Sequence, residues 1–169
     1  MLYTLLKASL PIPNTGKKTG GEKLSLKLAT FELLPASGFG YYTISPSTRQ
    51  YGTHATIQML LDIARQQYWN MPKLPIGIGD ISLHDGAAMP PHKAHRHGRN
   101  VDLRPFRIDA RKLPTAIHES SYDRAMTELL VKNLLAHCNV RRILFNDVKI
   151  HGVHTFPGHN NHLHVETKE

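Results

Sequence analysis

Hydrophobic residues recur at helical spacing in two segments of this chain. The first predicted helix covers residues 54–67, with Thr53 as its N-cap, because a threonine side chain can accept a hydrogen bond from the first helical turn. Its expected buried positions are Ile57, Leu60, Leu61 and Ala64. The second predicted helix covers about residues 122–137, with Ser120 or Ser121 as its N-cap. Its expected buried stripe is Met126, Leu129, Leu130, Leu134 and Leu135.

Short apolar segments bounded by turn-forming residues predict strands. They cover residues 39–45, 74–82, 100–104, 142–146 and 162–167. Glycines alternate with apolar residues in the second segment, which indicates that another backbone or a ligand passes close to it. Few helices and several short strands favour an α+β fold with a small, mostly antiparallel sheet, flanking helices and long loops.

The sequence divides into an N-terminal arm and one domain. Residues 11–24 are rich in proline, glycine and lysine, so we expect a loop or mobile arm there. We place the arm at residues 1–37 and the domain at residues 38–169. The chain has 169 residues and 40% hydrophobic content, which is enough for one compact core. No internal repeat or linker divides it further.

The formal net charge of +8 favours an anionic partner, such as nucleic acid, a membrane surface or the bacterial cell wall. Charge alone does not choose among these partners, and it also favours solubility. No apolar run is long enough for a membrane span. The first ten residues lack a basic region followed by a sustained apolar stretch, so we predict no signal peptide.

Histidine, rather than cysteine, supplies the candidate chemistry. The single cysteine, Cys138, excludes an internal disulfide and a cysteine-based zinc site, and we expect it to be a buried or half-buried thiol. The twelve histidines nearly equal the thirteen carboxylates in number. Eight of them fall in residues 91–102 and 151–164. Such clustering indicates metal binding or acid–base chemistry.

The two histidine-rich stretches contain the donors of a catalytic zinc site. A loop that turns at Gly98 and enters a strand would bring His95 and Asp102 together. With His164, two imidazoles and one carboxylate would then occupy three positions of a tetrahedral Zn²⁺ and leave the fourth for water. His162 lies two residues before His164, so both side chains would face the same side of a strand. His162 would then be close enough to exchange protons with that water.

Simpler interpretations of the same residues remain open at this point. A single His-x-His pair is commonly a solvated strand edge, and a histidine-rich segment can bind metal adventitiously without catalysis. Two clusters that each have a glycine turn and a strand context favour the catalytic interpretation.

Three segments of the sequence together resemble the penicillin-insensitive murein endopeptidases. They are residues 78–81 (IGDI), 94–102 (AHRHGRNVD) and 158–165 (GHNNHLHV). That family belongs to a larger zinc peptidase group with lysostaphin, the D-Ala-D-Ala peptidases and the hedgehog signalling domain. The resemblance covers roughly residues 38–166, and residues 122–124 and 143–147 also look like family members without long insertions.

The resemblance implies one zinc ion bound by His95, Asp102 and His164 in a cleft surrounded by the long loops. It implies that His162 is the catalytic histidine and that His159 is a further active-site histidine. The implied reaction is hydrolysis of the D-alanyl–diaminopimelate cross-bridge of peptidoglycan. No serine nucleophile is involved, so β-lactams would not inhibit it.

Two further histidines are candidates for the site. His92 matches a family histidine three residues before the first ligand. His118, before the second predicted helix, would touch substrate or a second metal, or else lie at the surface as histidines often do. Asn100 departs from the family pattern, in which an acidic or small residue often precedes Val-Asp.

The expected place of action is the periplasmic cell wall. Without a signal peptide, the protein would be a phage lysis enzyme released through a membrane pore, or an antibacterial effector exported into a rival cell. The expected partners are peptidoglycan peptide stems, with an export machinery or an immunity protein in the second setting. The bond cleaved, D,D or L,D, stays open.

Two alternative functions compete with the peptidase. A metal-dependent nuclease of the His-Asn-His type is suggested by the basic charge and by residues 159–162 (HNNH). The basic residues are scattered, however, and the His95–Asp102 pair has no place in that motif, so no nucleic acid partner is expected. The other alternative is a zinc-containing binding domain without hydrolysis, against which the retention of His159 and His162 argues.

Overall fold

The computed structural model describes residues 31–168, which contain two helices, one 3₁₀ turn and eight strands. The helices are α1 (His54–Asn70) and α2 (Arg124–Ala136), and the 3₁₀ turn is η1 (Ser47–Arg49). The strands are β1 (Glu32–Leu33), β2 (Ser37–Gly38), β3 (Tyr41–Thr43), β4 (Tyr51–Gly52), β5 (Ile76–Ile78), β6 (Asn100–Leu103), β7 (Val140–Leu144) and β8 (Leu163–Thr167). The predicted α+β class is confirmed.

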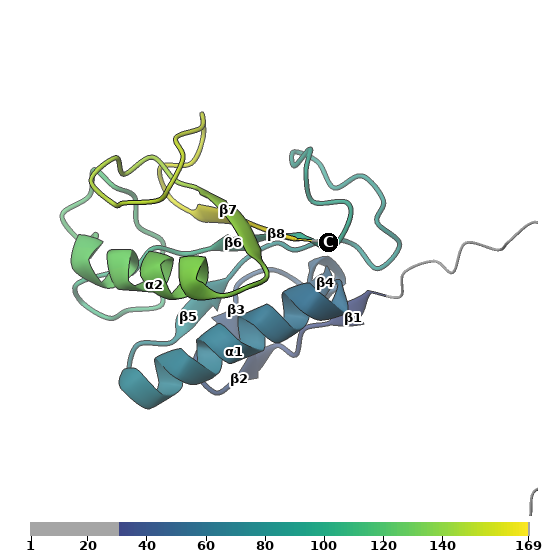
Figure 1. Cartoon of the computed structure of the whole chain (residues 1–169), viewed down its shortest axis with the longest axis horizontal. Helices are drawn as coiled ribbons and strands as arrows, with labels where there is room; N and C mark the ends of the chain where they lie inside the picture. Colours follow the sequence, from purple (N-terminus) through teal and green to yellow (C-terminus); the bar gives the residue numbers. More distant parts are fainter. Residues whose placement is uncertain (1–30, 169) are drawn as a thin grey trace, which may run out of the picture.

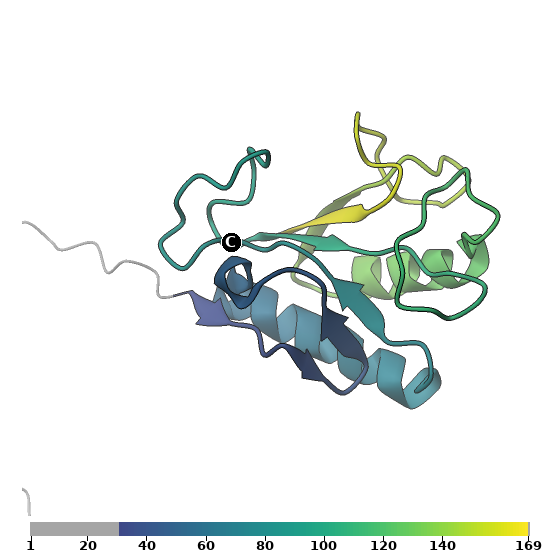
Figure 2. The same cartoon turned by 180° about the vertical axis from the view of Figure 1, so that it is seen from behind.

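Six strands form one sheet in the order β2-β3-β5-β6-β8-β7, and β1 pairs separately with β4. All neighbouring strands are antiparallel except β3 and β5, which run parallel. Both helices lie on the same side of this sheet, and the long loops around residues 83–99 and 145–162 rise on the other side (Figures 1 and 2). The predicted small, mostly antiparallel sheet is therefore observed.

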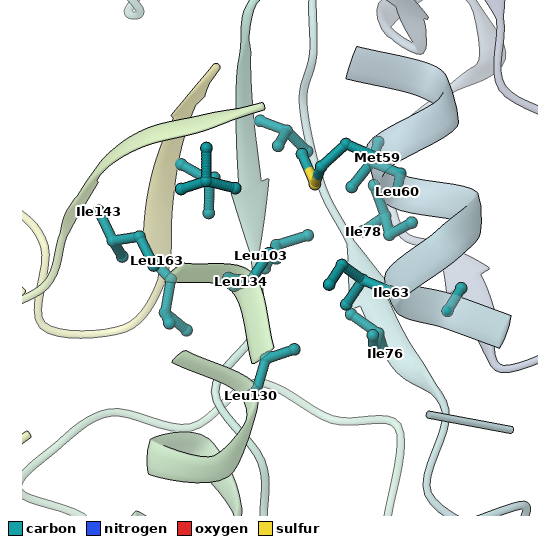
Figure 3. Close-up of a cluster of buried hydrophobic side chains, with 14 of the residues drawn as sticks. Met59, Leu60, Ile63, Ile76, Ile78, Leu103, Leu130, Leu134, Ile143 and Leu163 are labelled. Carbon is teal, nitrogen blue, oxygen red and sulfur yellow. The ribbon is translucent and has the colours of Figure 1, made fainter. Parts of the chain in front are cut away.

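The hydrophobic core fills the space between the helices and the sheet (Figure 3). Helix α1 contributes Met59, Leu60 and Ile63, all at most 4% exposed. Alternate residues of the strands face them, because successive side chains of a strand point to opposite faces. The buried strand residues labelled in Figure 3 are Ile76, Ile78, Leu103, Ile143 and Leu163. The residues between them on β6 and β8 therefore face the side of the loops.

Helix α1 forms as its hydrophobic periodicity predicts. Oγ1 of Thr53 accepts a hydrogen bond from the amide of Thr56, so the predicted N-cap is confirmed. The helix extends three residues beyond its predicted end and stops before Pro72, which cannot continue a helix. Ile57, Leu60 and Ala64 are buried as predicted, and Leu61 is partly buried against the core.

Helix α2 begins later than predicted, and its N-cap is Asp123 rather than Ser120 or Ser121. The carboxylate of Asp123 accepts a hydrogen bond from the amide of Met126 at 3.0 Å. The buried face also differs, because Leu129 and Leu135 are 36% and 41% exposed. The buried residues of the helix are Thr127, Leu130, Val131 and Leu134.

The predicted burial of Cys138 was wrong as well. This residue lies in the turn after α2, and its thiol is exposed. The helix ends at Ala136, so Cys138 no longer follows the periodicity that places side chains against the core.

The end of the predicted N-terminal arm packs on the domain. Residues 31–37 contain β1 and the first residue of β2, and Leu34 between these strands is 1% exposed in the core. The rest of that arm, including the predicted loop at residues 11–24, lies outside the described residues. Within the part of the chain that the structure describes, no helix is long and apolar enough to cross a membrane.

A buried carboxylate fixes the loop after β7 to the start of α2. Oδ2 of Asp147 accepts hydrogen bonds from the hydroxyl of Tyr122 at 2.8 Å and from Nε of Arg124 at 2.6 Å. Burial by itself raises the pKa of Asp147, but the hydrogen bonds from these two side chains outweigh it and hold the pKa below its ordinary value. The ionised carboxylate is thus favoured in the folded state.

We expect Asp147→Ala to lower the free energy of unfolding by about 2–3 kcal/mol, because it leaves the Tyr122 hydroxyl without its acceptor. Chemical denaturation at neutral pH measures this difference. Since the folded-state pKa is depressed, the stabilisation is present above the ordinary aspartate pKa of about 4 and is lost as the pH falls below it. The difference in the free energy of unfolding between wild type and variant should therefore become smaller in acid. An equal gap at pH 3 and pH 7 would contradict this assignment.

Candidate metal centre

The loop between β5 and β6 carries the first histidine-rich stretch. His95 in this loop is 1% exposed. The loop turns at Gly98, as predicted, where φ is +63° and a Cβ atom would lie 2.7 Å from the amide nitrogen of Thr53. Only glycine combines this left-handed backbone with so close an approach. The turn places the loop against the start of α1, and the chain then enters β6.

The central strand pair β6–β8 brings together the other two predicted ligands. Asp102 lies directly opposite His164 in the antiparallel register, on the face turned away from the core residues Val101 and Leu103. Gly79 lies against the backbone of Asp102, and its amide donates to the Asp102 carbonyl. The close backbone approach predicted from the glycines of residues 74–82 is therefore observed.

Three donor atoms of the predicted zinc ligands converge on one another. Nδ1 of His164 is 3.0 Å from Oδ1 of Asp102 and 3.2 Å from Nε2 of His95. Nε2 of His95 is 3.3 Å from the same Asp102 oxygen. Ligand atoms held about 2.1 Å from a tetrahedral zinc lie about 3.4 Å from one another, so the triangle has nearly the size that zinc requires.

The hydrogen bonding of His95 also fits a metal ligand. Its Nδ1 lies 2.9 Å from the carbonyl oxygen of Ile81, which can only accept, so Nδ1 carries the hydrogen. Nε2 is then the ring nitrogen that could bind a metal, and it faces Asp102 and His164. Metal-binding histidines commonly donate their second ring N–H to a backbone carbonyl in this way. The donor set of two imidazoles and one carboxylate suits Zn²⁺.

Asp102 is ionised in this setting. Burial by itself raises the pKa of Asp102, but the hydrogen bonds with His164 and His95 outweigh it and bring the pKa well below its ordinary value. The carboxylate is therefore available as an anionic ligand throughout the neutral range.

His92 forms a second grouping with two of the same residues. Single ligand atoms of His92, His95 and Asp102 all lie within 4.8 Å of one another. Nε2 of His92 is 2.9 Å from Oδ2 of Asp80, and its Nδ1 is 3.8 Å from Oδ2 of Asp102. The distance of 3.8 Å between His92 and Asp102 is wider than the 3.0–3.3 Å within the set of His95, Asp102 and His164.

Asp80 was not identified as a site residue from the sequence. It lies after β5, is 8% exposed, and forms ion pairs with His92 and with Arg49, whose Nη2 is 3.1 Å from Oδ2. It holds the His92 ring beside His95, where the two ring centroids are 4.5 Å apart. In the sequence, only its position in the IGDI segment (residues 78–81) indicated that Asp80 belongs to the site.

His162 lies at the edge of this centre, one residue before β8. Its side chain is 28% exposed, and its Nε2 is 3.9 Å from Oδ1 of Asp102. Its Nδ1 donates to Oδ1 of Asn161 at 2.9 Å, which leaves a lone pair on Nε2. Burial lowers the pKa of His162, although the Asp102 charge opposes this, so the neutral ring is favoured. The side chain can accept a proton and remains accessible to solvent.

His159 stands beside His162, with 4.7 Å between the ring centroids and 5.6 Å to the His164 ring. Its Nδ1 lies 3.1 Å from the Pro157 carbonyl oxygen and 3.2 Å from that of Phe156. These carbonyls fix the orientation of the ring. Five of the predicted site histidines, all except His118, thus form one connected cluster of rings.

His118 is exposed in the segment before α2. Among the described residues, no hydrogen bond, ion pair or ring contact joins it to the cluster. The neighbouring residue Ile117 donates its amide to the carbonyl of Asn160, so this segment lies next to the loop that carries His159.

A comparison of the chain with protein-family models and with curated proteins found no match.

Proposed function

We propose that this protein is a zinc-dependent peptidase that hydrolyses peptide cross-links of bacterial peptidoglycan. The observation that carries the proposal is the convergence of Nε2 of His95, Oδ1 of Asp102 and Nδ1 of His164 within 3.0–3.3 Å of one another. Three protein ligands are the number that catalytic zinc sites use. The resemblance of the two histidine motifs to murein endopeptidases supports peptidoglycan as the substrate.

The residues around the centre suit peptide hydrolysis. Zn²⁺ held by the three ligands would act as a Lewis acid on the scissile carbonyl and would lower the pKa of a water. His162 would take a proton at Nε2 and later return it to the leaving amine. His159, with Nδ1 oriented by two backbone carbonyls, would in its protonated form direct Nε2–H at the negative charge that develops on the substrate and stabilise it.

The proposed substrate is the D-alanyl–diaminopimelate cross-bridge, and the proposed place of action is the periplasmic cell wall. The basic chain, with a formal net charge of +8, suits an anionic polymer such as peptidoglycan. Release with a phage or export as an antibacterial effector would bring the protein to this substrate.

Metal removal tests the proposal directly. We expect the full-length protein to release muropeptides from purified sacculi, a strong chelator to abolish this release, and added zinc to restore it. Penicillin should leave the rate unchanged, because no serine nucleophile takes part. Mass analysis of the products identifies the bond cleaved. Digestion that survives the chelator, or that penicillin inhibits, would contradict the proposal.

A plasmid-nicking assay on the same preparation separates the alternative functions. Metal-dependent nicking without muropeptide release would indicate the His-Asn-His-type nuclease. Zinc binding with neither activity would indicate a binding domain without hydrolysis.

A further inference from the structure

The side chain of Asn100 joins the two halves of the metal centre. Its Nδ2 donates to the carbonyl oxygen of Ala94 at 2.8 Å, and its Oδ1 lies 3.2 Å from Nε2 of His164. Ala94 directly precedes His95 in the loop, whereas His164 lies on the neighbouring strand β8. One amide group therefore contacts both the loop that carries one ligand and the ring of another ligand.

These two contacts determine the orientation of the Asn100 side-chain amide. A backbone carbonyl only accepts hydrogen bonds, so the Asn100 nitrogen must face Ala94 and its oxygen must face His164. An amide oxygen also only accepts, so Nε2 of His164 must carry a hydrogen. The other ring nitrogen, Nδ1, is then the one that can bind a cation through its lone pair or, without a cation, donate a proton to the Asp102 carboxylate at 3.0 Å.

This nitrogen points into the centre, where it lies 3.0 Å from Oδ1 of Asp102 and 3.2 Å from Nε2 of His95. Nε2 of His95 faces the same space, because Nδ1 of His95 donates to the Ile81 carbonyl. An ionised carboxylate and two ring nitrogens in a buried space need protons or a cation among them. Bound zinc would replace those protons.

We propose that Asn100 is a positioning residue that sets the tautomer of His164, so that Nδ1 faces the metal, and that ties the His95 loop to the sheet. The inference rests on the zinc site of the proposed function. An aspartate at this position would still accept from Nε2–H of His164, but it would repel the carbonyl of Ala94. The two roles of Asn100 can therefore be separated by substitution.

The first test needs no variant. Long-range ¹H–¹⁵N correlation spectra of the full-length protein with ¹⁵N-labelled histidine, recorded with and without zinc, show which ring nitrogen of His164 binds the metal. We expect zinc to shift the Nδ1 resonance of His164 while Nε2 keeps its proton. A zinc-bound Nε2 with a proton on Nδ1 would overturn the inference. This spectrum is informative whether or not the protein cleaves peptidoglycan.

The second test measures zinc affinity by competition with a chromogenic chelator. Asn100→Leu, which keeps the side-chain size but neither polar contact, should weaken zinc binding by about 10–100-fold, as expected for loss of a partner that orients a ligand. Asn100→Asp should keep most of the affinity. Both variants should show faster amide hydrogen exchange in residues 92–97, because both lose the tether to Ala94.

Asn161→Ala is the matched control, since this asparagine contacts His162 rather than a ligand, and its zinc affinity should stay at the wild-type value. Wild-type affinity in a folded Asn100→Leu variant would overturn the inference. If Asn100→Leu does not fold, the tautomer of His164 in the wild-type protein and the zinc affinity of Asn100→Asp provide the test. An Asn100→Asp variant that binds zinc as weakly as a variant without a ligand would overturn the inference. Failure of wild-type zinc binding would instead contradict the proposed function, and hydrogen exchange in residues 92–97 would still test the tether between Asn100 and Ala94.

Discussion

His164→Ala should abolish stoichiometric zinc binding and, with it, muropeptide release. Among the described residues, this residue supplies one of the three donors that converge within 3.0–3.3 Å, since its Nδ1 lies 3.0 Å from Asp102 and 3.2 Å from His95. Loss of a partner that merely orients a ligand costs about 10–100-fold in metal affinity, so loss of the ligand itself should cost more than about 100-fold. Elemental analysis after dialysis, and chelator competition for the residual affinity, measure the effect.

A histidine outside the metal centre provides the control for this experiment. His151→Ala removes an exposed histidine from the long loop before β8, outside the ring cluster, and it should retain one zinc per chain. Melting temperatures of both zinc-free variants should stay near that of zinc-free wild type. A His164→Ala variant that keeps zinc at full affinity would show that another set, such as the one containing His92, holds the metal.

His162→Ala should lower the rate of cross-link hydrolysis by about 10²–10⁴-fold while zinc remains bound. The expected loss follows from the position of the side chain. Nε2 of His162 is 3.9 Å from Oδ1 of Asp102, outside the 3.0–3.3 Å triangle of the ligands, and its side chain is 28% exposed. In the proposed mechanism it would therefore move a proton between substrate and solvent rather than hold the metal.

Three measurements on the same His162→Ala preparation identify its role. The rate of muropeptide release should fall, whereas zinc content and melting temperature should match wild type. His159→Ala should behave in the same way with a loss of about 10²–10³-fold, the usual effect of removing a group that stabilises developing charge. Near-wild-type hydrolysis by His162→Ala would refute the mechanism, and loss of zinc would make His162 a ligand.

Much of the fold follows from local patterns in the sequence. Helix α1 and its Thr53 cap could be predicted because both depend on residues within a few positions of one another. The start of α2 could not be predicted, because three residues that can cap a helix lie within four positions. Only tertiary contacts determine which of them is the N-cap. The Ser121 hydroxyl hydrogen-bonds with Arg107 and Thr115, and Asp123 is the residue that caps the helix.

The sequence by itself determined the donor set of the candidate site: the histidines and the carboxylate stand in two short motifs with glycine turns. The tertiary structure decided their separations, because the antiparallel register of β6 and β8 places Asp102 opposite His164, which lies 62 residues further along the chain. It also decided the supporting contacts of Asp80, the Ile81 carbonyl and Asn100. Such contacts join residues that are distant in sequence through single hydrogen bonds, which leave no periodicity or spacing to detect.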